Sequence, residues 1–296
     1  MSMSRRDFMK DLGALSAAAG VAAALPGIAT AATPQARAAA GPATPAGKRP
    51  RILLTGHRGY VGSRFVAAFH DRYDIVGYDL VEGDDILDQA KLTARMAGCD
   101  VVVHEAAIPA PVEGRSYADY FHTNVQGTMS VAQAAVAAGV RRLVYASSTT
   151  IYGIEHGIPF AYPIDEGQKF VSQYLPADRL HCRDIDLSYH TSKVMAEQIV
   201  AWHGLNRKLQ TVALRYGPID KVVVGTSVSS ANVLQATRLA IDSPRDFWYE
   251  AFSVVDAVPH IDLAKSRALL GYVPEPAALS QYQQISTFQH RLDQGA

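Results

Sequence analysis

The apolar run Arg51-Ile-Leu-Leu-Thr55 leads directly into the glycine-rich stretch Gly56-His-Arg-Gly59-Tyr-Val-Gly62, and these residues decide the fold. The run predicts a buried strand, and Phe65, Val66 and Phe69 follow at helical spacing. Glycines between a strand and a helix let the backbone approach a pyrophosphate, to which the helix N-terminus offers N–H groups and a positive dipole end. The pattern therefore predicts a dinucleotide site. Its phosphate-binding residues would be Gly56, Arg58, Gly59, Tyr60, Val61 and Gly62.

A second predicted strand, residues 75–78, ends in Asp79, 23 residues after Gly56. A carboxylate at this point accepts hydrogen bonds from the adenosine ribose and repels a 2′-phosphate, which favours NAD over NADP. The alternative interpretation of Asp79 is an ordinary surface loop residue. Arg58 inside the glycine-rich loop leaves NADP binding open.

The strand and helix pattern then repeats through residues 100–104, 124–138 and 143–146. This alternation predicts an α/β fold with a doubly wound parallel sheet of the Rossmann type, binding its ligand at the carboxyl ends of the strands. His104 ends one of these strands. No second metal ligand lies at a useful spacing from it, so we interpret His104 as a structural histidine and predict no metal site.

Hydroxyl side chains at 147–150 follow the strand 143–146, and Tyr189 and Lys193 lie four residues apart further on. On a helix this spacing puts both side chains on one face, where the ammonium stabilises a phenolate whose pKa is ordinarily near 10. Ser148 would hold a substrate oxygen while Tyr189 takes or returns its proton, and a hydride passes to or from a nicotinamide. Tyr189, Lys193 and Ser148 are therefore the predicted catalytic residues.

With these motifs the chain resembles the extended short-chain dehydrogenases, the NAD-dependent epimerase/dehydratase family. The matching segments run from residue 51 to about residue 275 and are residues 55–62, 85–88, 104–107, 124–128, 147–153, 189–193, 214–216 and 270–272.

The resemblance implies roles for particular residues. Ser148, Tyr189 and Lys193 would form the catalytic triad, and Lys193 would also bind the nicotinamide ribose. The further cofactor-binding residues that it implies are Asp85 and Ile86 beside the adenine, Ala106 and Ala107 along the ribose and phosphates, and Asn124. It also implies a homodimer formed through the two helices that pair in this family.

Departures from the family pattern bear on the reaction. Thr149 and Thr150 stand where sugar-nucleotide dehydratases of this family carry Asp-Glu, so the acid and base needed for elimination are missing. The loop after Leu214 is abbreviated. We divide the chain into a cofactor domain, residues 51–217, and a small substrate lobe, residues 218–296, which is more like that of uronate dehydrogenases and favours a substrate without a nucleotide.

The segment 154–188 is longer than usual for the family and is interpreted either as an active-site lid or as a variable surface excursion. It carries Cys182, which could pair with Cys99 in an oxidising compartment. Because Cys99 precedes a predicted buried strand, we expect it to be an inert core thiol.

The first residues have the pattern of an export signal. Arg5 and Arg6 precede an uncharged run rich in Ala, Leu and Gly, and residues 29–31 resemble a cleavage site. Residues 1–32 therefore resemble a twin-arginine signal peptide. This implies that the protein folds and binds its cofactor in the cytoplasm and that the twin-arginine export machinery then carries it to the periplasm. The alternative is an uncleaved membrane anchor. Residues 33–50, rich in Pro, Ala and Gly, are a predicted linker.

Overall composition excludes several classes of protein. The 296 residues hold 28 basic and 28 acidic side chains, which argues against nucleic-acid binding, and the 48% of hydrophobic residues argues against disorder.

The predicted function is hydride transfer at a secondary alcohol of a sugar or sugar acid. An epimerase that retains NAD is the alternative, favoured by export, because an exported enzyme has no obvious pool of oxidised cofactor. A non-catalytic NAD-binding module is the third hypothesis.

Overall fold

The computed structural model describes residues 49–154, 163–173, 184–221, 226–257 and 260–275, which belong to one compact unit. The predicted signal peptide and most of the predicted linker lie outside the described residues, as do Cys182 and parts of the long segment 154–188.

The described residues form a six-stranded, wholly parallel sheet with the order β2-β1-β3-β4-β5-β6. The strands are β1 (Arg51–Thr55), β2 (Asp74–Tyr78), β3 (Val101–His104), β4 (Arg142–Ser148), β5 (Gln210–Tyr216) and β6 (Trp248–Val254). This arrangement confirms the predicted doubly wound sheet, and the four strands expected from the sequence are present within one or two residues of their predicted bounds.

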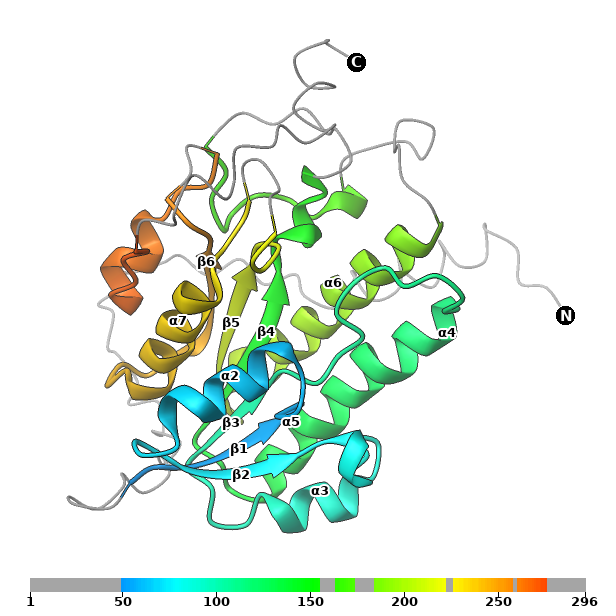
Figure 1. The fold of residues 1–296 in the computed structure, drawn as a ribbon, viewed down its shortest axis with the longest axis vertical. Helices are drawn as coiled ribbons and strands as arrows, with labels where there is room; N and C mark the ends of the chain where they lie inside the picture. The colour runs from blue at the N-terminus through cyan, green and yellow to red at the C-terminus, as the bar shows by residue number, and fades with distance from the viewer. Residues whose placement is uncertain (1–48, 155–162, 174–183, 222–225, 258–259, 276–296) are drawn as a thin grey trace, which may run out of the picture. The chain divides into compact units, whose positions relative to one another are not determined.

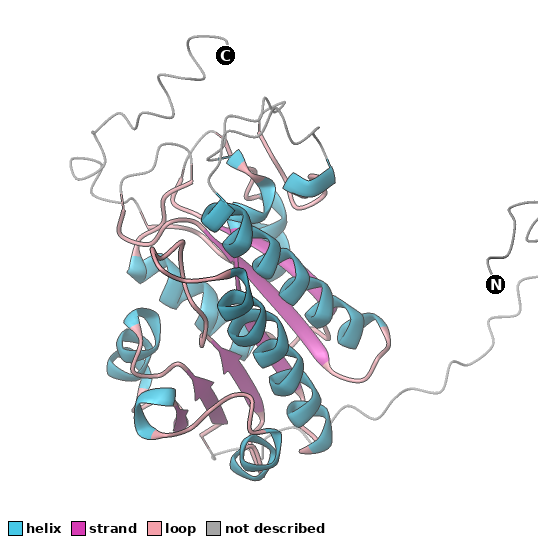
Figure 2. Ribbon diagram, turned by 90° about the vertical axis from the view of Figure 1, so that its right-hand side faces the viewer, coloured by secondary structure: helices cyan, strands magenta, loops and turns pink. Residues whose placement is uncertain are grey.

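Helices cover both faces of the sheet (Figures 1 and 2). They are α2 (Tyr60–Phe69), α3 (Gln89–Arg95), α4 (Tyr117–Tyr120), α5 (Gly127–Ala137), α6 (Asp184–Leu205) and α7 (Ser230–Asp242). Helices α2 and α7 pack together on one face, while α3, α5 and α6 pack in a row on the other. A π-helical turn, Phe121–Gln126, leads into α5.

Strands covered on both faces carry apolar side chains at every position. In β1, Ile52 and Leu54 contribute to the core under α2 and α7, whereas Leu53 contributes to the core under α3, α5 and α6. All three are fully buried. The uninterrupted apolar run that opened the sequence is therefore the physical consequence of a central parallel strand.

The direction of the chain across the sheet reverses between β1 and β3, since β2 lies on one side of β1 and β3 on the other. Such a reversal opens a crevice at the carboxyl ends of these two strands, where α/β proteins bind ligands. The predicted glycine-rich loop lies at this crevice, at the end of β1 (Figure 1).

The sheet continues past residue 217, where we expected the substrate lobe to begin. Helix α7 packs on β4 and β5, and β6 pairs in parallel with β5 from Thr211↔Trp248 to Tyr216↔Val254. Residues 230–254 therefore complete the sheet, and the division into a cofactor domain and a substrate lobe stays a prediction.

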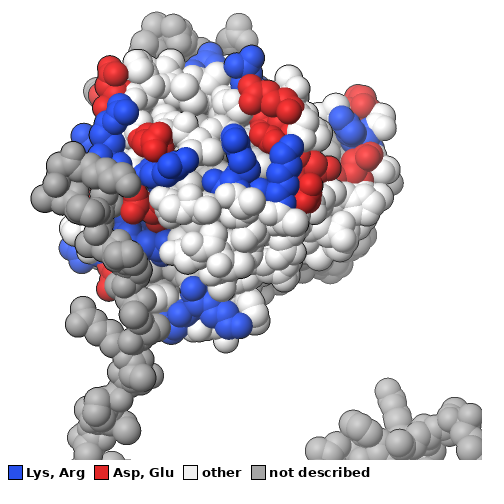
Figure 3. All heavy atoms as spheres, turned by 90° about the horizontal axis from the view of Figure 1, so that it is seen from below, with Lys and Arg blue, Asp and Glu red and all other residues white. Residues whose placement is uncertain are grey.

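Charged side chains of both signs are interspersed on the face seen in Figure 3. No helix among the described residues has the length and apolar character that crossing a membrane requires.

Candidate active site

Helix α6 and strand β4 bring the predicted catalytic residues to one edge of the sheet. Tyr189 and Lys193 lie one turn apart on α6 and are 8% and 4% exposed. The Lys193 ammonium donates a hydrogen bond to the carbonyl oxygen of Ala146 on β4 at 2.5 Å and lies 4.9 Å from the centre of the Tyr145 ring. The lysine is therefore fixed at the carboxyl end of β4, two residues before Ser148.

Ser148 is the last residue of β4, and the chain turns there into the 3₁₀ helix Thr149–Tyr152. Its hydroxyl accepts a hydrogen bond from the Thr150 amide at 3.2 Å, and the residue is half-buried. Thr149 and Thr150 are buried, at the positions where the family resemblance implies the acid and base of a dehydratase. Among the described residues, the predicted proton-transfer group Tyr189 thus lies one helical turn from a buried lysine, which is bound two residues before Ser148.

A buried ion pair locks α6 against the sheet behind this site. Glu197, one turn after Lys193, binds Arg215 of β5 with 2.6 Å between Oε1 and Nη2, and the two side chains are 0% and 3% exposed. Glu197 also accepts hydrogen bonds from Ser147 at 2.5 Å and from Tyr249 of β6 at 3.0 Å. Arg215 in turn donates to the Tyr152 hydroxyl at 2.7 Å. This network connects β4, β5, β6 and α6 directly below Ser148 and Lys193.

Burial sets the protonation of the groups at this edge. Desolvation lowers the pKa of Lys193 to about 8, although the negative charges of Glu105 and Glu197 oppose that shift. Desolvation also raises the pKa of Glu105, the residue after β3, to about 7, against the hydrogen bond from Tyr216 and the charge of Lys193. Glu197 behaves differently: its pKa is lowered despite burial, because Arg215, Ser147 and Tyr249 all stabilise its charge.

The glycine-rich loop has the geometry that close approach to a phosphate requires. Gly56 has φ +71°, and a Cβ there would lie 2.8 Å from the Ala106 nitrogen. A Cβ on Gly62 would lie 2.2 Å from the Gly56 carbonyl oxygen. No other residue type fits at these two positions. Gly59 caps α2, so the amides of Tyr60 and Val61 open the helix beside the crevice.

Asp79 lies directly beside this loop. Its Oδ2 accepts a hydrogen bond from the Arg58 amide at 2.9 Å, and its Oδ1 accepts one from the Val81 amide at 3.1 Å. The Arg58 guanidinium is exposed and lies 3.5 Å from the Glu82 carboxylate. A tight glycine loop with a carboxylate at its edge fits NAD, whose pyrophosphate and adenosine ribose need these two features.

The remaining predicted cofactor residues surround the same edge. Asp85 is exposed and its carboxylate accepts from the Leu87 amide, whereas Ile86 is buried against Gly127. Ala106 and Ala107 are half-buried after β3. Contact of these four with the cofactor stays a prediction.

Asn124 is committed to internal hydrogen bonds. Its side chain accepts from the Ile108 amide at 2.8 Å and donates to the Ile108 carbonyl at 3.2 Å and to the Ser192 hydroxyl at 2.9 Å. It is fully buried. Asn124 thus ties the loop after β3 to helix α6, and direct contact with the cofactor also stays a prediction.

His104 has the structural role expected of it. One ring nitrogen hydrogen-bonds the Thr55 hydroxyl at 2.7 Å and the other the Thr128 hydroxyl at 3.1 Å, and burial lowers the pKa of the ring to about 3. It is therefore neutral. Within the described parts of the chain, no group of three acidic, histidine or cysteine side chains is placed to hold a metal. Cys99 is a buried free thiol whose pKa is raised by burial, as expected for an inert core residue.

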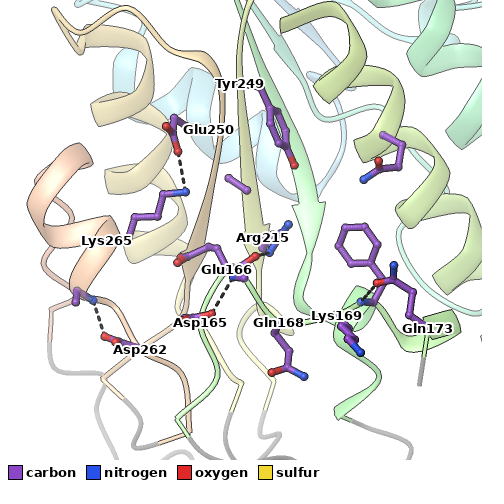
Figure 4. A pocket seen from close by; sticks show the side chains of 15 residues that line it. Asp165, Glu166, Gln168, Lys169, Gln173, Arg215, Tyr249, Glu250, Asp262 and Lys265 are labelled. Carbon is purple, nitrogen blue, oxygen red and sulfur yellow. Dashed lines mark hydrogen bonds and ion pairs between the residues drawn. The ribbon is translucent and has the colours of Figure 1, made fainter. Parts of the chain in front are cut away.

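A cavity of about 700 Å³ lies beside the site (Figure 4). Residues 165–170 and 173, within segment 154–188, form one wall, and Tyr249, Glu250 and Lys265 contribute to the lining. Arg215 also lines it, while Ser148, Tyr189 and Lys193 do not. Several lining groups are paired with one another, including Lys265 with Glu250 at 2.7 Å. This part of the long segment therefore lies beside β6, and its role as a lid or as a surface excursion stays a prediction.

Sequence reasoning missed Glu105, Glu197 and Tyr249. Glu197 had a detectable signal, since it follows Lys193 by four residues on the predicted helix. Glu105 stood inside a motif matched to the family, without a role. Tyr249 had no signal: it forms a bulge in β6 and has φ +81°, a strained conformation for an aromatic residue.

Known proteins resemble the chain in sequence and in fold. L-arabinose 1-dehydrogenase (NAD(P)(+)) of Haloferax volcanii is 29% identical over 177 residues, covering 56% of this chain and 66% of that protein. UDP-glucose 4-epimerase of Azospirillum brasilense is 27% identical over 188 residues, covering 56% of this chain and 48% of that protein. The chain thus spans less than two thirds of the length of these curated relatives.

Solved structures share the fold at lower identity. A short-chain dehydrogenase/reductase superfamily protein from Agrobacterium tumefaciens with bound NAD superposes with a TM-score of 0.64 at 19% identity, over 83% of this chain and 99% of that one. A mutated uronate dehydrogenase gives 0.59 at 20% identity, over 84% and 87%. Residues 52–219, more than half of the sequence, match the NAD dependent epimerase/dehydratase family; the chain therefore belongs to this family, and NAD is its cofactor.

Proposed function

We propose that the protein transfers a hydride between NAD and a secondary alcohol of a sugar or sugar acid that carries no nucleotide. The observation that carries this proposal is the buried Lys193, held on the Ala146 carbonyl one helical turn from Tyr189 and next to the strand end at Ser148. A buried ammonium is costly unless it serves a charge nearby, and the phenolate of Tyr189 is such a charge.

The residues divide the reaction between them. In oxidation, the substrate C–H bond breaks with its electron pair leaving as hydride, for which bound NAD supplies the acceptor. The hydroxyl proton passes to the Tyr189 phenolate, and the carbon–oxygen bond becomes a carbonyl. Lys193 stabilises the phenolate before transfer, and the Ser148 hydroxyl orients the substrate oxygen. Reduction runs through the same steps in reverse.

Two observations support a sugar without a nucleotide. The loop after Leu214 is abbreviated and leaves little of the chain for a nucleotide-sized ligand, whereas Thr149 and Thr150, in the places of the acid and base of the dehydratases, argue against elimination. In addition, a curated relative is named as an arabinose dehydrogenase, and structures of uronate and glucuronic acid dehydrogenases share the fold.

The test is an assay of purified protein with NAD against a panel of aldoses and uronates, following nicotinamide absorbance at 340 nm. Tyr189→Phe removes the proton-transfer group and leaves the glycine loop untouched. We expect turnover to fall by at least about 10³-fold while NAD binding, measured by calorimetry, stays within about twofold. Full activity in this variant contradicts the mechanism.

An epimerase that returns the hydride to the same substrate is the second candidate. It is favoured by the relatives named UDP-glucose 4-epimerase and by the export pattern at Arg5 and Arg6. Product formation without net change in nicotinamide absorbance distinguishes it. Denaturing the purified protein and quantifying the released nucleotide provides a second test, since near-stoichiometric NAD or NADH supports a retained cofactor.

We propose further that the twin-arginine machinery exports the folded protein to the periplasm and that the protein forms a homodimer. The support is the residue 1–32 pattern for export and the family resemblance for the dimer. Replacing Arg5 and Arg6 by lysine should abolish export in a twin-arginine-competent host, and light scattering of the purified protein reports the oligomeric state.

A further inference from the structure

A hydrogen bond joins two segments that lie 160 residues apart in the sequence, beyond the carboxyl ends of β1 and β5. The hydroxyl of Tyr60, the first residue of α2, donates to Oδ2 of Asp220 at 2.7 Å. Tyr60 follows the glycine-rich loop at the end of β1, and Asp220 lies four residues after the end of β5. Strands β3 and β4 lie between β1 and β5 in the sheet. The bond therefore connects the cofactor loop to a loop two strands beyond its nearest neighbour.

Asp220 is held in place for this contact by its own loop. Its amide donates to the Val228 carbonyl at 2.9 Å, and its Oδ1 accepts a hydrogen bond from the amide of Ser230, the first residue of α7, at 2.8 Å. Its backbone has φ +50°, a left-handed conformation that residues other than glycine adopt rarely. Although partial burial raises the pKa of Asp220, hydrogen bonds from Tyr60 and Ser230 outweigh that effect and hold this pKa below its ordinary value. Both carboxylate oxygens are thus engaged, one by each helix.

The ring of Tyr60 is held as well as its hydroxyl. The guanidinium of Arg64, one turn later on α2, lies 3.6 Å from the centre of the ring, and its Nη1 donates to the Tyr60 carbonyl at 3.0 Å. The tyrosine is nevertheless 51% exposed. A side chain bound by a cation on its face and by a carboxylate at its hydroxyl forms a defined bridge on the surface of the protein.

The predicted path of the cofactor follows the same strand ends. It runs from Asp79, just after β2, to Lys193, which is fixed at the end of β4, and so passes the ends of β1 and β3. The bridge runs from β1 to β5 on the side of α2 and α7, which pack together (Figure 1). Helix α6, with Tyr189 and Lys193, packs on the other face of the sheet. The bridge therefore bounds the crevice on the side away from the catalytic helix.

We propose that Tyr60 and Asp220 form a clasp along the cofactor crevice, which has to open before NAD enters or leaves. The hydroxyl and the carboxylate bind one another, while the backbone amide of Tyr60 remains for the pyrophosphate. This inference goes beyond the proposed function, since it concerns how long NAD stays bound, whatever the substrate is. A long residence time suits an enzyme that keeps its cofactor through many turnovers.

A clasp affects the binding rates and the affinity differently. Entry and exit both take place only in molecules whose clasp is open, so both rate constants are multiplied by the open fraction. When opening costs the same with and without NAD, the Kd does not depend on the clasp. A direct contact with the nucleotide behaves otherwise, because its loss raises the dissociation rate and the Kd together. The two kinds of residue can therefore be told apart.

The test measures NADH binding in Tyr60→Phe, which removes the hydroxyl and keeps the ring and the backbone amide. Excess NAD displaces bound NADH in a stopped-flow instrument, nicotinamide fluorescence gives the dissociation rate, and a fluorescence titration gives the Kd. We expect the dissociation rate to rise about tenfold, the effect of one hydrogen bond to a charged acceptor, while the Kd stays within about twofold. An unchanged dissociation rate overturns the proposal. So does a Kd that rises by the same factor as the rate, since it would indicate direct contact.

Asp220→Asn tests the other half of the clasp. Asparagine tolerates φ +50° and still accepts a hydrogen bond from the Ser230 amide, but it offers Tyr60 no charged acceptor. The dissociation rate should rise less than in Tyr60→Phe. The double variant should release NADH no faster than Tyr60→Phe, because both changes break one contact. Effects that multiply in the double variant would show that the two residues act independently, which contradicts a clasp.

Tyr117→Phe is the matched control. Tyr117 is 47% exposed, close to the 51% of Tyr60, and its hydroxyl lies 3.7 Å from the sulfur of Met195 on α6, on the other face of the sheet from α2. Its loss should leave the dissociation rate and the Kd unchanged, and a rise equal to that in Tyr60→Phe also overturns the proposal. Because every measurement follows NADH and none needs a sugar, a failure of the proposed function leaves the test of the clasp intact.

Discussion

Glu197 and Glu105 are both acids near the carboxyl ends of the central strands, yet the structure surrounds them in opposite ways. Glu197 has a guanidinium at 2.6 Å and two hydroxyl donors, so it is charged although fully buried. Glu105 has one hydroxyl at 3.2 Å, and burial raises its pKa to about 7. The number and charge of the donors, more than depth of burial, decide which carboxyl stays ionised. Glu197 therefore fixes α6 to the sheet as a permanent anion, while Glu105 can gain or lose a proton near neutral pH.

Replacing glutamate by glutamine should have opposite effects on the free energy of unfolding at position 197 and at position 105. Glu197→Gln leaves Arg215 charged and buried without its partner, so we expect the free energy of unfolding to fall by about 3–5 kcal/mol at pH 7. Urea unfolding followed by circular dichroism measures this loss. A matched double variant, Glu197→Gln with Arg215→Met, removes both charges and should recover part of it. A loss below about 1 kcal/mol would show that the ion pair contributes little.

Glu105→Gln should instead stabilise the fold above neutral pH. The pKa of Glu105 is raised from its ordinary value to about 7, so the folded state holds its proton more tightly than the unfolded state and loses stability as pH rises through 7. Glutamine carries no such proton. The variant should match the wild type near pH 4.5 and exceed it by on the order of 2 kcal/mol at pH 8. Thermal or urea unfolding across this range measures the difference, and a difference independent of pH contradicts the assignment.

The contrast between the two regions also explains what the sequence could predict. The glycine loop, Asp79 and the Tyr189–Lys193 pair are local patterns, because a strand end, a turn or one helical turn determines the geometry that their chemistry needs. The strands followed from apolar runs for the same reason, since a central parallel strand is buried on both faces. The structure places these residues on the expected strand ends, turn and helix, and their roles in the site stay predictions.

The electrostatic partners could not be predicted in this way. Glu105 meets Tyr216 across 111 residues, and Glu197 meets Tyr249 across 52. Only the order of strands in the sheet brings them together. Tyr249 depends further on a bulge in β6 at φ +81°, which packing imposes against the preference of an aromatic residue. Residues 230–254 likewise join the sheet as α7 and β6, which only the strand order reveals.

The smallest expected changes in stability come from removing the tyrosine hydroxyl that hydrogen-bonds each of the two glutamates. Tyr249→Phe takes a donor from Glu197, which keeps Ser147 and Arg215, so we expect a loss of about 1 kcal/mol in the free energy of unfolding that is constant from pH 6 to pH 8. Tyr216→Phe takes the hydroxyl from Glu105, and the pKa of that acid should rise further because the hydrogen bond had lowered it. A higher folded-state pKa means that more stability is lost once the pH passes through it. The loss in Tyr216→Phe should therefore grow from pH 6 to pH 8, by about 1 kcal/mol for each unit of further shift. Urea unfolding at pH 6, 7 and 8 measures both variants together. Parallel behaviour of the two phenylalanine variants would mean that Glu105 is held as firmly as Glu197, and that the pH response lies with another group.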